Sequence, residues 1–128
     1  IVSTDVNLQQ NSGLTKEMLT DEYLVQAEKR MMSMLAETYR KNYESEGLDP
    51  SKISLSISSK YKDVSGHKVS IFYIKALYKG SRPNRSLYAI ALRGDDIVTI
   101  TCSRDGDKEI DIDQGECKKA IENELSVE

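Results

Sequence analysis

Six carboxylates lie between the two cysteines in the C-terminal third of the sequence, and acidic side chains at such close spacing are typical of calcium loops. Counted from the first, they fill positions 1, 3, 5, 7, 9 and 12 of an EF-hand loop: Asp105, Asp107, Glu109, Asp111, Asp113 and Glu116. Position 6, however, is Ile110, where the sharp turn of that loop requires glycine, and residues 97–102 are typical of a strand. Calcium binding is therefore the weaker hypothesis, and a solvated acidic hairpin leading into a helix is favoured.

The two cysteines that bracket this run, Cys102 and Cys117, suit a disulfide better than other chemistry. Redox pairs are usually spaced Cys-x-x-Cys, whereas fourteen residues separate these two. A zinc site lacks ligands, because His67 is the only histidine in the chain. Cys102 shares the strand parity of Ile100. Cys117 shares a helical face with Ile121, so a bridge would fasten the last helix to the sheet.

Such a disulfide bears on both stability and compartment. Closing a loop of this length stabilises a protein by roughly 3 kcal/mol in the chain-entropy model. An even number of cysteines, in a chain whose polar first residues resemble the start of a mature exported protein, indicates an oxidising compartment. We therefore expect a periplasmic or extracellular protein. The alternatives are a trimmed N-terminus and two unpaired core cysteines, which a cytosolic protein would tolerate.

The sequence offers no catalytic constellation. Nucleophilic catalysis needs a nucleophile beside a base, but His67 stands alone among turn residues, and no G-x-S-x-G motif or phosphate-binding glycine loop occurs. Paired carboxylates for glycoside hydrolysis remain open, because acidic residues are plentiful. With no tryptophan and a single phenylalanine, however, the chain has little with which to stack a sugar ring. We expect a non-enzymatic protein without a cofactor.

A basic loop over residues 79–85 (KGSRPNR) is the other candidate binding feature. The residues expected to contact a partner are Lys79, Arg82, Asn84 and Arg85. If this loop lies apart from the acidic run of residues 105–116, the resulting charge polarity would steer a charged partner. The alternative is an ordinary solvated hairpin tip.

The elements that would position these residues begin with a long helix. Thr20 is a suitable N-cap followed by two carboxylates, and Gly47 and Pro50 favour a stop. The helix would run for about 26 residues, or roughly 39 Å, so it must lie along a sheet or a partner. Its apolar stripe comprises Leu24, Ala27, Met31, Met34, Leu35 and Thr38, widened by Tyr39 and Tyr43.

The pattern changes to strands after the helix. The expected strands cover residues 53–58, 69–78, 87–92 and 97–102, and Ile110 and Ile112 suggest a further short edge strand. Because the second and third strands are apolar on both faces, either the two helices lie on opposite faces of the sheet or a second protein covers one of them.

The sequence therefore predicts an α+β fold with a long N-terminal helix, an antiparallel meander of four to five strands, and a C-terminal helix packed on the sheet. We expect a single domain over residues 1–128, with an irregular lead-in over residues 1–13. The net charge of −3 provides no basic face for nucleic acid, and no stretch approaches the roughly 20 apolar residues of a membrane span.

The second half of the chain resembles the PsbP-like fold, named for an extrinsic subunit of the photosynthetic oxygen-evolving complex. The similarity covers residues 66–125 and rests on Gly66, the segments YIKALYKG, SLYAIALRG and DDIVTITC, and the closing CKKAIENEL. It implies an antiparallel sheet with a helix packed on it, and a role as an assembly factor or binding subunit. It transfers no functional residue.

Together these features indicate a small exported binding protein whose partner is another protein. The most concrete hypothesis is an inhibitor or immunity-type protein that neutralises a toxic or lytic enzyme by docking on it. The alternative is a non-enzymatic structural or assembly subunit of an envelope complex, acting as a homodimer.

Overall fold

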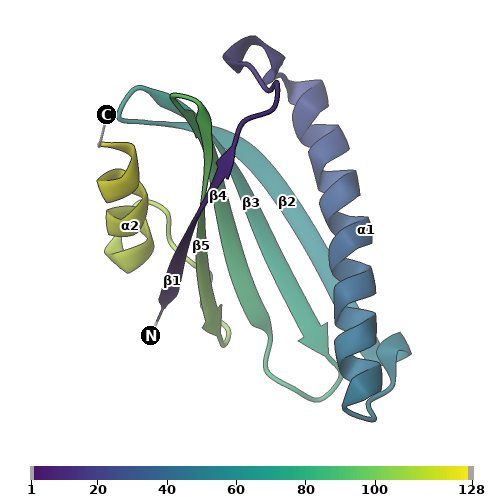
Figure 1. Ribbon diagram of the computed structural model, residues 1–128. Helices are drawn as coiled ribbons and strands as arrows, with labels where there is room; N and C mark the ends of the chain where they lie inside the picture. Colours follow the sequence, from purple (N-terminus) through teal and green to yellow (C-terminus); the bar gives the residue numbers. More distant parts are fainter. Residues whose placement is uncertain (1, 127–128) are drawn as a thin grey trace.

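A computed structural model of the protein describes residues 2–126. The chain forms a five-stranded antiparallel sheet with one helix on each face (Figure 1). In chain order the elements are β1 (Ser3–Gln10), α1 (Asp21–Ser45), β2 (Ile53–Val64), β3 (His67–Tyr78), β4 (Asn84–Arg93), β5 (Asp96–Asp105) and α2 (Gly115–Leu125), with 3-10 turns at Lys16–Met18 and Pro50–Lys52. The strand order is β1-β5-β4-β3-β2, so β2 to β5 form the expected meander. The α+β prediction is confirmed.

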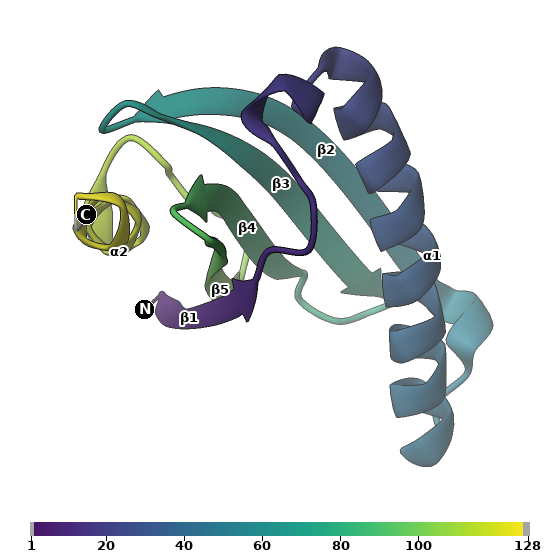
Figure 2. The same ribbon diagram turned by 45° about the horizontal axis from the view of Figure 1, so that its top comes forward.

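The long helix α1 begins where the sequence predicts. The Oγ1 atom of Thr20 accepts a hydrogen bond from the backbone N–H of Tyr23 at 3.2 Å, which satisfies one of the free donors of the first turn. Leu24 and Ala27 are buried against Phe72 of β3. Figure 2 shows α1 along β2 on one face of the sheet, while α2 lies on the opposite face near β1 and β5.

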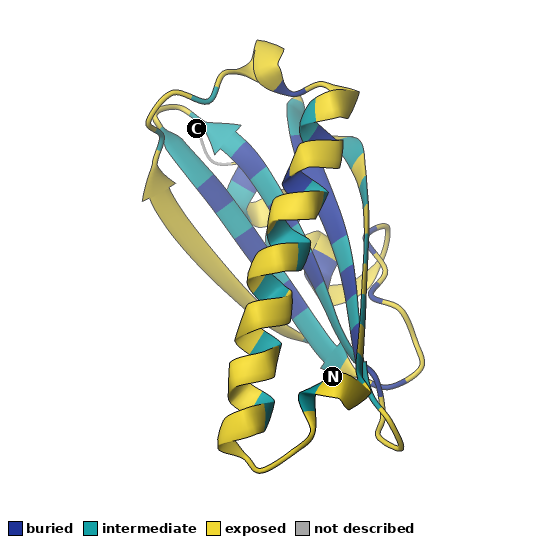
Figure 3. Cartoon of the chain, turned by 90° about the vertical axis from the view of Figure 1, so that its right-hand side faces the viewer, coloured by how far each residue is buried: buried dark blue, intermediate teal, exposed yellow. Residues whose placement is uncertain are grey.

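The C-terminal half of α1 meets the sheet through tyrosines. Tyr43 stacks on Tyr78 of β3, with ring centroids 5.3 Å apart. Met34 and Thr38 are exposed, so the predicted core stripe is wrong at these two positions. The reason is that in this half of α1 the residues in contact with the sheet are Tyr39 and Tyr43. Most of the remaining surface of this half faces solvent (Figure 3).

Strand alternation divides the core between the two faces of the sheet. Val69 and Ile71 of β3 point towards α2, where Ile121 and Leu125 are buried against them and their neighbours. Phe72, one residue further on, points to the opposite face and packs under α1. Helices on opposite faces therefore account for strands that are apolar on both sides.

The disulfide joins Cys102 of β5 to Cys117 of α2, as the parity of the two residues predicts. Both cysteines are buried, and the bridge attaches the first turn of α2 to the sheet. Ile121 lies one turn further along the same face and is also buried, so the covalent link and the apolar contacts act on one side of the helix.

Two expectations about irregular and extended segments need correction. The lead-in over residues 1–13 is not irregular, because residues 3–10 form β1 and pair with β5; Ile1 lies outside the described residues. Conversely, Ile110 and Ile112 form no strand. They lie in the loop of residues 106–114, with both side chains buried in the core beneath α2. β1 already occupies the position beside β5 that an edge strand from this segment would have taken.

Candidate functional site: a charged cleft and an open sheet edge

A cleft of about 640 Å³ lies on the α2 side of the sheet. We call it the charged cleft, and we call residues 106–114, which form its lip, the covering loop. The floor is formed by side chains of β2, β3 and β4, namely Ser56, Ser58, Lys60, Tyr73, Lys75 and Arg85. The carboxylates of the lip are Glu109, Asp111 and Asp113. This volume lies within the roughly 300–1,000 Å³ range of small-molecule sites.

The covering loop is held in place from below. Ile110 and Ile112 are 5% and 4% exposed and belong to the same apolar cluster as Ile121 of α2. Because Ile110 and Ile112 point inward, the alternate residues of the segment remain exposed over the cleft. Apolar anchoring of every second residue therefore fixes a row of carboxylates along the lip.

One end of the cleft is closed by Arg85. Its side chain is only 14% exposed, and its Nε and Nη2 atoms donate to the carbonyl oxygens of Gly106 at 3.1 Å and Asp107 at 3.2 Å. The carboxylate of Glu109 lies 3.9 Å from Nη1. The guanidinium thus ties the start of the covering loop to β4.

Arg85 is the middle residue of three cations that lie side by side on the sheet. Lys75 of β3 is directly opposite it on one side, and Arg104 of β5 is directly opposite it on the other. Like charges in opposite positions destabilise a sheet. The carbonyls of the covering loop compensate Arg85, but neither Lys75 nor Arg104 forms an ion pair within residues 2–126.

The other end of the cleft is closed by an ion pair between Lys62 of β2 and Asp113 of the covering loop. Hydrogen bonding to the Lys62 ammonium, together with its charge, lowers the pKa of Asp113 below its ordinary value of 3.8. The backbone N–H of Asp113 also donates to Asp111 Oδ1 at 2.7 Å, which orients the Asp111 carboxylate.

Between these two closures lies Tyr73. Burial raises the pKa of its phenol, and the carboxylates of Asp113, Asp111 and Glu109 raise it further, while Lys62 opposes them. The ammonium of Lys60 lies 5.7 Å from the centre of the Tyr73 ring.

A second candidate surface is the outer edge of β1. All of its residues, Ser3–Gln10, are exposed, and Val6 and Leu8 are 40% and 55% exposed. β1 carries one charge, Asp5, and neither lysine nor proline. Lysines and prolines are the usual protection of a free edge against pairing with another strand, so this edge is unprotected.

The other free edge of the sheet differs from β1 in both respects. β2 carries Lys60 and Lys62, and α1 packs beside it. Charged side chains and a covering helix are two of the devices that protect sheet edges. Strand addition is therefore favoured at β1 alone.

The predicted partner residues do not form one surface. Lys79 and Arg82 are exposed in the β3–β4 loop, whereas Arg85 turns into the charged cleft. Asn84 Nδ2 donates to Asp105 Oδ1 at 2.8 Å. The basic segment and the acidic run are therefore in contact, so the condition for charge polarity between them, that they lie apart, is not met.

The calcium hypothesis is not supported by the geometry. Asp105 contacts Asn84, Glu109 lies beside Arg85, and Asp113 pairs with Lys62. Across residues 2–126, no three carboxylate, histidine or cysteine side chains gather closely enough to share a metal ion.

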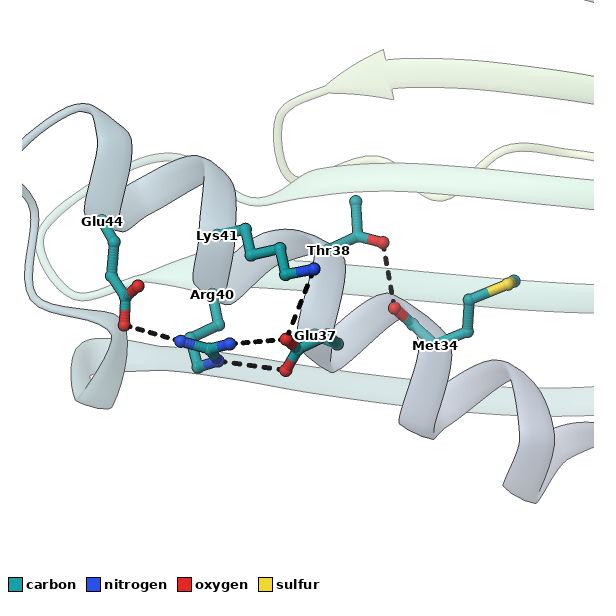
Figure 4. Close-up of polar contacts among 6 residues, drawn as sticks. All are labelled: Met34, Glu37, Thr38, Arg40, Lys41 and Glu44. Atoms are coloured by element: carbon teal, nitrogen blue, oxygen red, sulfur yellow. Dashed lines mark hydrogen bonds and ion pairs between the residues drawn. The ribbon is translucent and has the colours of Figure 1, made fainter.

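The exposed face of α1 is occupied by its own ion pairs (Figure 4). Arg40 donates to Glu37 through Nε at 3.0 Å and to Glu44 through Nη1 at 2.9 Å, and Lys41 lies 3.7 Å from Glu37. Hydrogen bonding to Arg40 lowers the pKa of the Glu37 carboxyl. These pairs link successive turns of a solvated helix.

No protein-family model matches the chain, and a search of curated proteins finds no match. The resemblance to the PsbP-like fold stays a prediction. Within the described residues, neither helix is long and apolar enough to cross a membrane.

Lys60, Tyr73 and Lys75 were not among the predicted site residues. Two signals in the sequence point to them: the polar alternation of Ser56, Ser58 and Lys60, and the polar Lys75 within an otherwise apolar strand. What the sequence does not contain is the position of the covering loop over these residues.

Proposed function

We propose that this protein is a non-enzymatic structural or assembly subunit of the periplasm or extracellular space, and that it dimerises by pairing β1 with β1 of a second copy. The observation that carries the proposal is the exposed, unprotected edge of β1. The intramolecular disulfide supports an oxidising compartment, because such bridges persist mainly in exported proteins.

The edge has free hydrogen-bonding groups in the right places. The N–H of Asn11 donates to the carbonyl of Asp95 at 2.9 Å, in line with the β1–β5 register. In an antiparallel ladder, alternate residues point their N–H and C=O groups to the same neighbour. The odd-numbered residues of β1 therefore bond to β5, and Thr4, Val6, Leu8 and Gln10 present their groups outward.

The edge is also complementary to itself. Consider a two-fold axis that is perpendicular to the sheet and passes midway between the Asn7 residues of the two copies. It places Val6 opposite Leu8 of the second copy, so that apolar side chains meet. Asp5 then lies opposite Gln9, and no like charges face each other. Such pairing would extend the sheet across both copies and satisfy the free backbone groups of the edge.

Sedimentation velocity over a range of concentrations tests the proposal. Because one strand edge buries less than a standard interface, we expect a dissociation constant on the order of micromolar. The double variant Val6→Lys/Leu8→Lys should be monomeric, because lysines on an edge oppose strand pairing. The matched control is Leu48→Lys, at a position 38% exposed after α1, which should dimerise like the wild type.

A wild type that is monomeric at every concentration contradicts the proposal. The edge would then be available to a strand of a different protein, as the inhibitor or immunity-type hypothesis requires. Circular dichroism of the lysine variants separates a loss of pairing from a loss of folding, since β1 also belongs to the sheet of the monomer.

A further inference from the structure

The charged cleft has two facing walls of opposite charge. The floor supplies Lys60 and Lys75, neither of which forms an ion pair within residues 2–126. The lip supplies Asp111, whose carboxylate contacts a backbone N–H but no cation. Glu109 and Asp113 are already held by Arg85 and Lys62 at the two ends. The charges left free are therefore two ammonium groups below and one carboxylate above.

These free groups lie at different points along the cleft. Ser56 is directly opposite Lys75, and Ser58 is directly opposite Tyr73 two residues further along the strands. A step of two residues is roughly 7 Å. Lys75 and the Ser56 hydroxyl therefore form a subsite for an anion at one end. Asp111, which lines the lip of the same cleft near Tyr73 and contacts a backbone N–H but no cation, supplies a subsite for a cation at the other end.

We propose that the charged cleft binds short peptides of two or three residues by their two charged ends. Lys75 and Ser56 hold the terminal carboxylate, and Asp111 holds the terminal ammonium. The charged ends of an extended dipeptide or tripeptide are separated by roughly 6–10 Å, which matches the two subsites. The cleft volume of about 640 Å³ accommodates such a ligand with room for its side chains.

The charge balance of the cleft selects against simpler ligands. A phosphate or a simple carboxylate pairs with Lys75 but leaves Asp111 without a partner. A lone cation pairs with Asp111 but leaves Lys75 without a partner. Because the whole chain has a net charge of −3, general attraction also opposes anions. A ligand with both charges pairs with Lys75 and with Asp111 at once.

Titrations followed by backbone amide NMR shifts test the proposal with three probes: trialanine, N-acetyl-trialanine and trialanine amide. Trialanine should shift the amides of the floor strands and the covering loop, with affinity in the millimolar range or tighter. Blocking either end should weaken binding about tenfold, because each block removes one ion pair. The site lies on the β2–β3 side of the sheet, so dimerisation through β1 does not decide the result.

Two variants assign the ends. Lys75→Gln should weaken trialanine binding about tenfold and remove the difference between trialanine and its amide. Asp111→Asn should instead remove the difference between trialanine and its acetylated form. The matched controls Lys29→Gln on α1 and Asp95→Asn in the β4–β5 turn change the same charges at exposed positions elsewhere and should bind like the wild type.

Three outcomes overturn the inference. The first is the absence of shifts in the cleft at about 10 mM trialanine, which excludes even weak binding. The second is equal binding of the acetylated and free peptides, which indicates a simple anion site. The third is an equal effect of the control substitutions, which indicates non-specific charge screening.

Discussion

Removing the disulfide should lower the stability of this protein by an amount that its loop length sets. Cys102 and Cys117 are 15 positions apart in the chain, and the chain-entropy model gives about 3 kcal/mol for a loop of this size. Unfolding 128 residues carries an entropy of about 0.27 kcal/mol per kelvin. Loss of the cross-link should therefore lower Tm by about 11 °C.

After reduction of the disulfide, the loss of stability should begin locally, in the segment that the bridge encloses. The covering loop and the first turn of α2 are joined to β5 by this bond, whereas Ile121 and Leu125 keep their apolar contacts after reduction. We therefore expect the reduced protein to remain folded at room temperature. Hydrogen exchange should become faster in the covering loop before it does so in β3, which lies in the core.

The assay is thermal unfolding followed by circular dichroism, with and without a phosphine reductant. The variant Cys102→Ala/Cys117→Ala should show the lowered Tm in both conditions, because it has no bond to reduce. A change of Tm below about 3 °C in the fully reduced wild type would refute the reasoning, since it would mean that the cross-link restrains little in the unfolded chain. So would two free thiols in native protein.

Two further predictions concern the charged cleft and the core. Because Lys62 holds the folded pKa of Asp113 below its ordinary value of 3.8, the stability that this pair contributes is complete above that value and is lost as pH falls through the folded pKa. An NMR titration should give an Asp113 midpoint below 3.8 that returns towards 3.8 in Lys62→Gln, and an unchanged midpoint would contradict the pairing. Phe72→Ala should cost about 3–5 kcal/mol in urea unfolding, because Phe72 is buried under α1. The control Val25→Ala, 43% exposed on the same helix, should cost less than about 1 kcal/mol, and equal effects would contradict the docking of α1.

The sequence predicts those parts of the fold that depend on local patterns. The Thr20 cap, the alternation of β2 and the shared faces of Cys102 and Cys117 are local, and the structure agrees with each. The exposure of Met34 is not local. It depends on how the twisted sheet turns away from a straight helix, which helical spacing alone does not encode.

The strand β1 was missed because its pattern is weak. Val6 and Leu8 do alternate with polar residues, but the segment is polar overall and no face of it is fully buried. Its pairing with β5 joins residues nearly a hundred positions apart in the chain. Such long-range pairing cannot be inferred from a local pattern. It also places β1 where an edge strand from Ile110 and Ile112 was expected, and these two residues lie in a buried loop.

The charged cleft was predictable only in its parts. The acidic run and the basic segment were both recognised, but whether they lie apart or together was left open. Arg85 brings them together by donating to the backbone carbonyls of Gly106 and Asp107. Because every residue has a backbone carbonyl, the sequence does not show which ones accept a hydrogen bond. Lys75 was not among the predicted contact residues, although it lines the cleft.

The pairing of β1 with a second copy is tested most directly by hydrogen exchange at individual amides, measured at several protein concentrations. In the monomer, the amides of Val6 and Leu8 point outward from the sheet, while that of Asn7 bonds to β5. The account predicts that Val6 and Leu8 become protected as the concentration rises through the micromolar range, with Asn7 protected throughout. Fast exchange of Val6 and Leu8 at every concentration would contradict it.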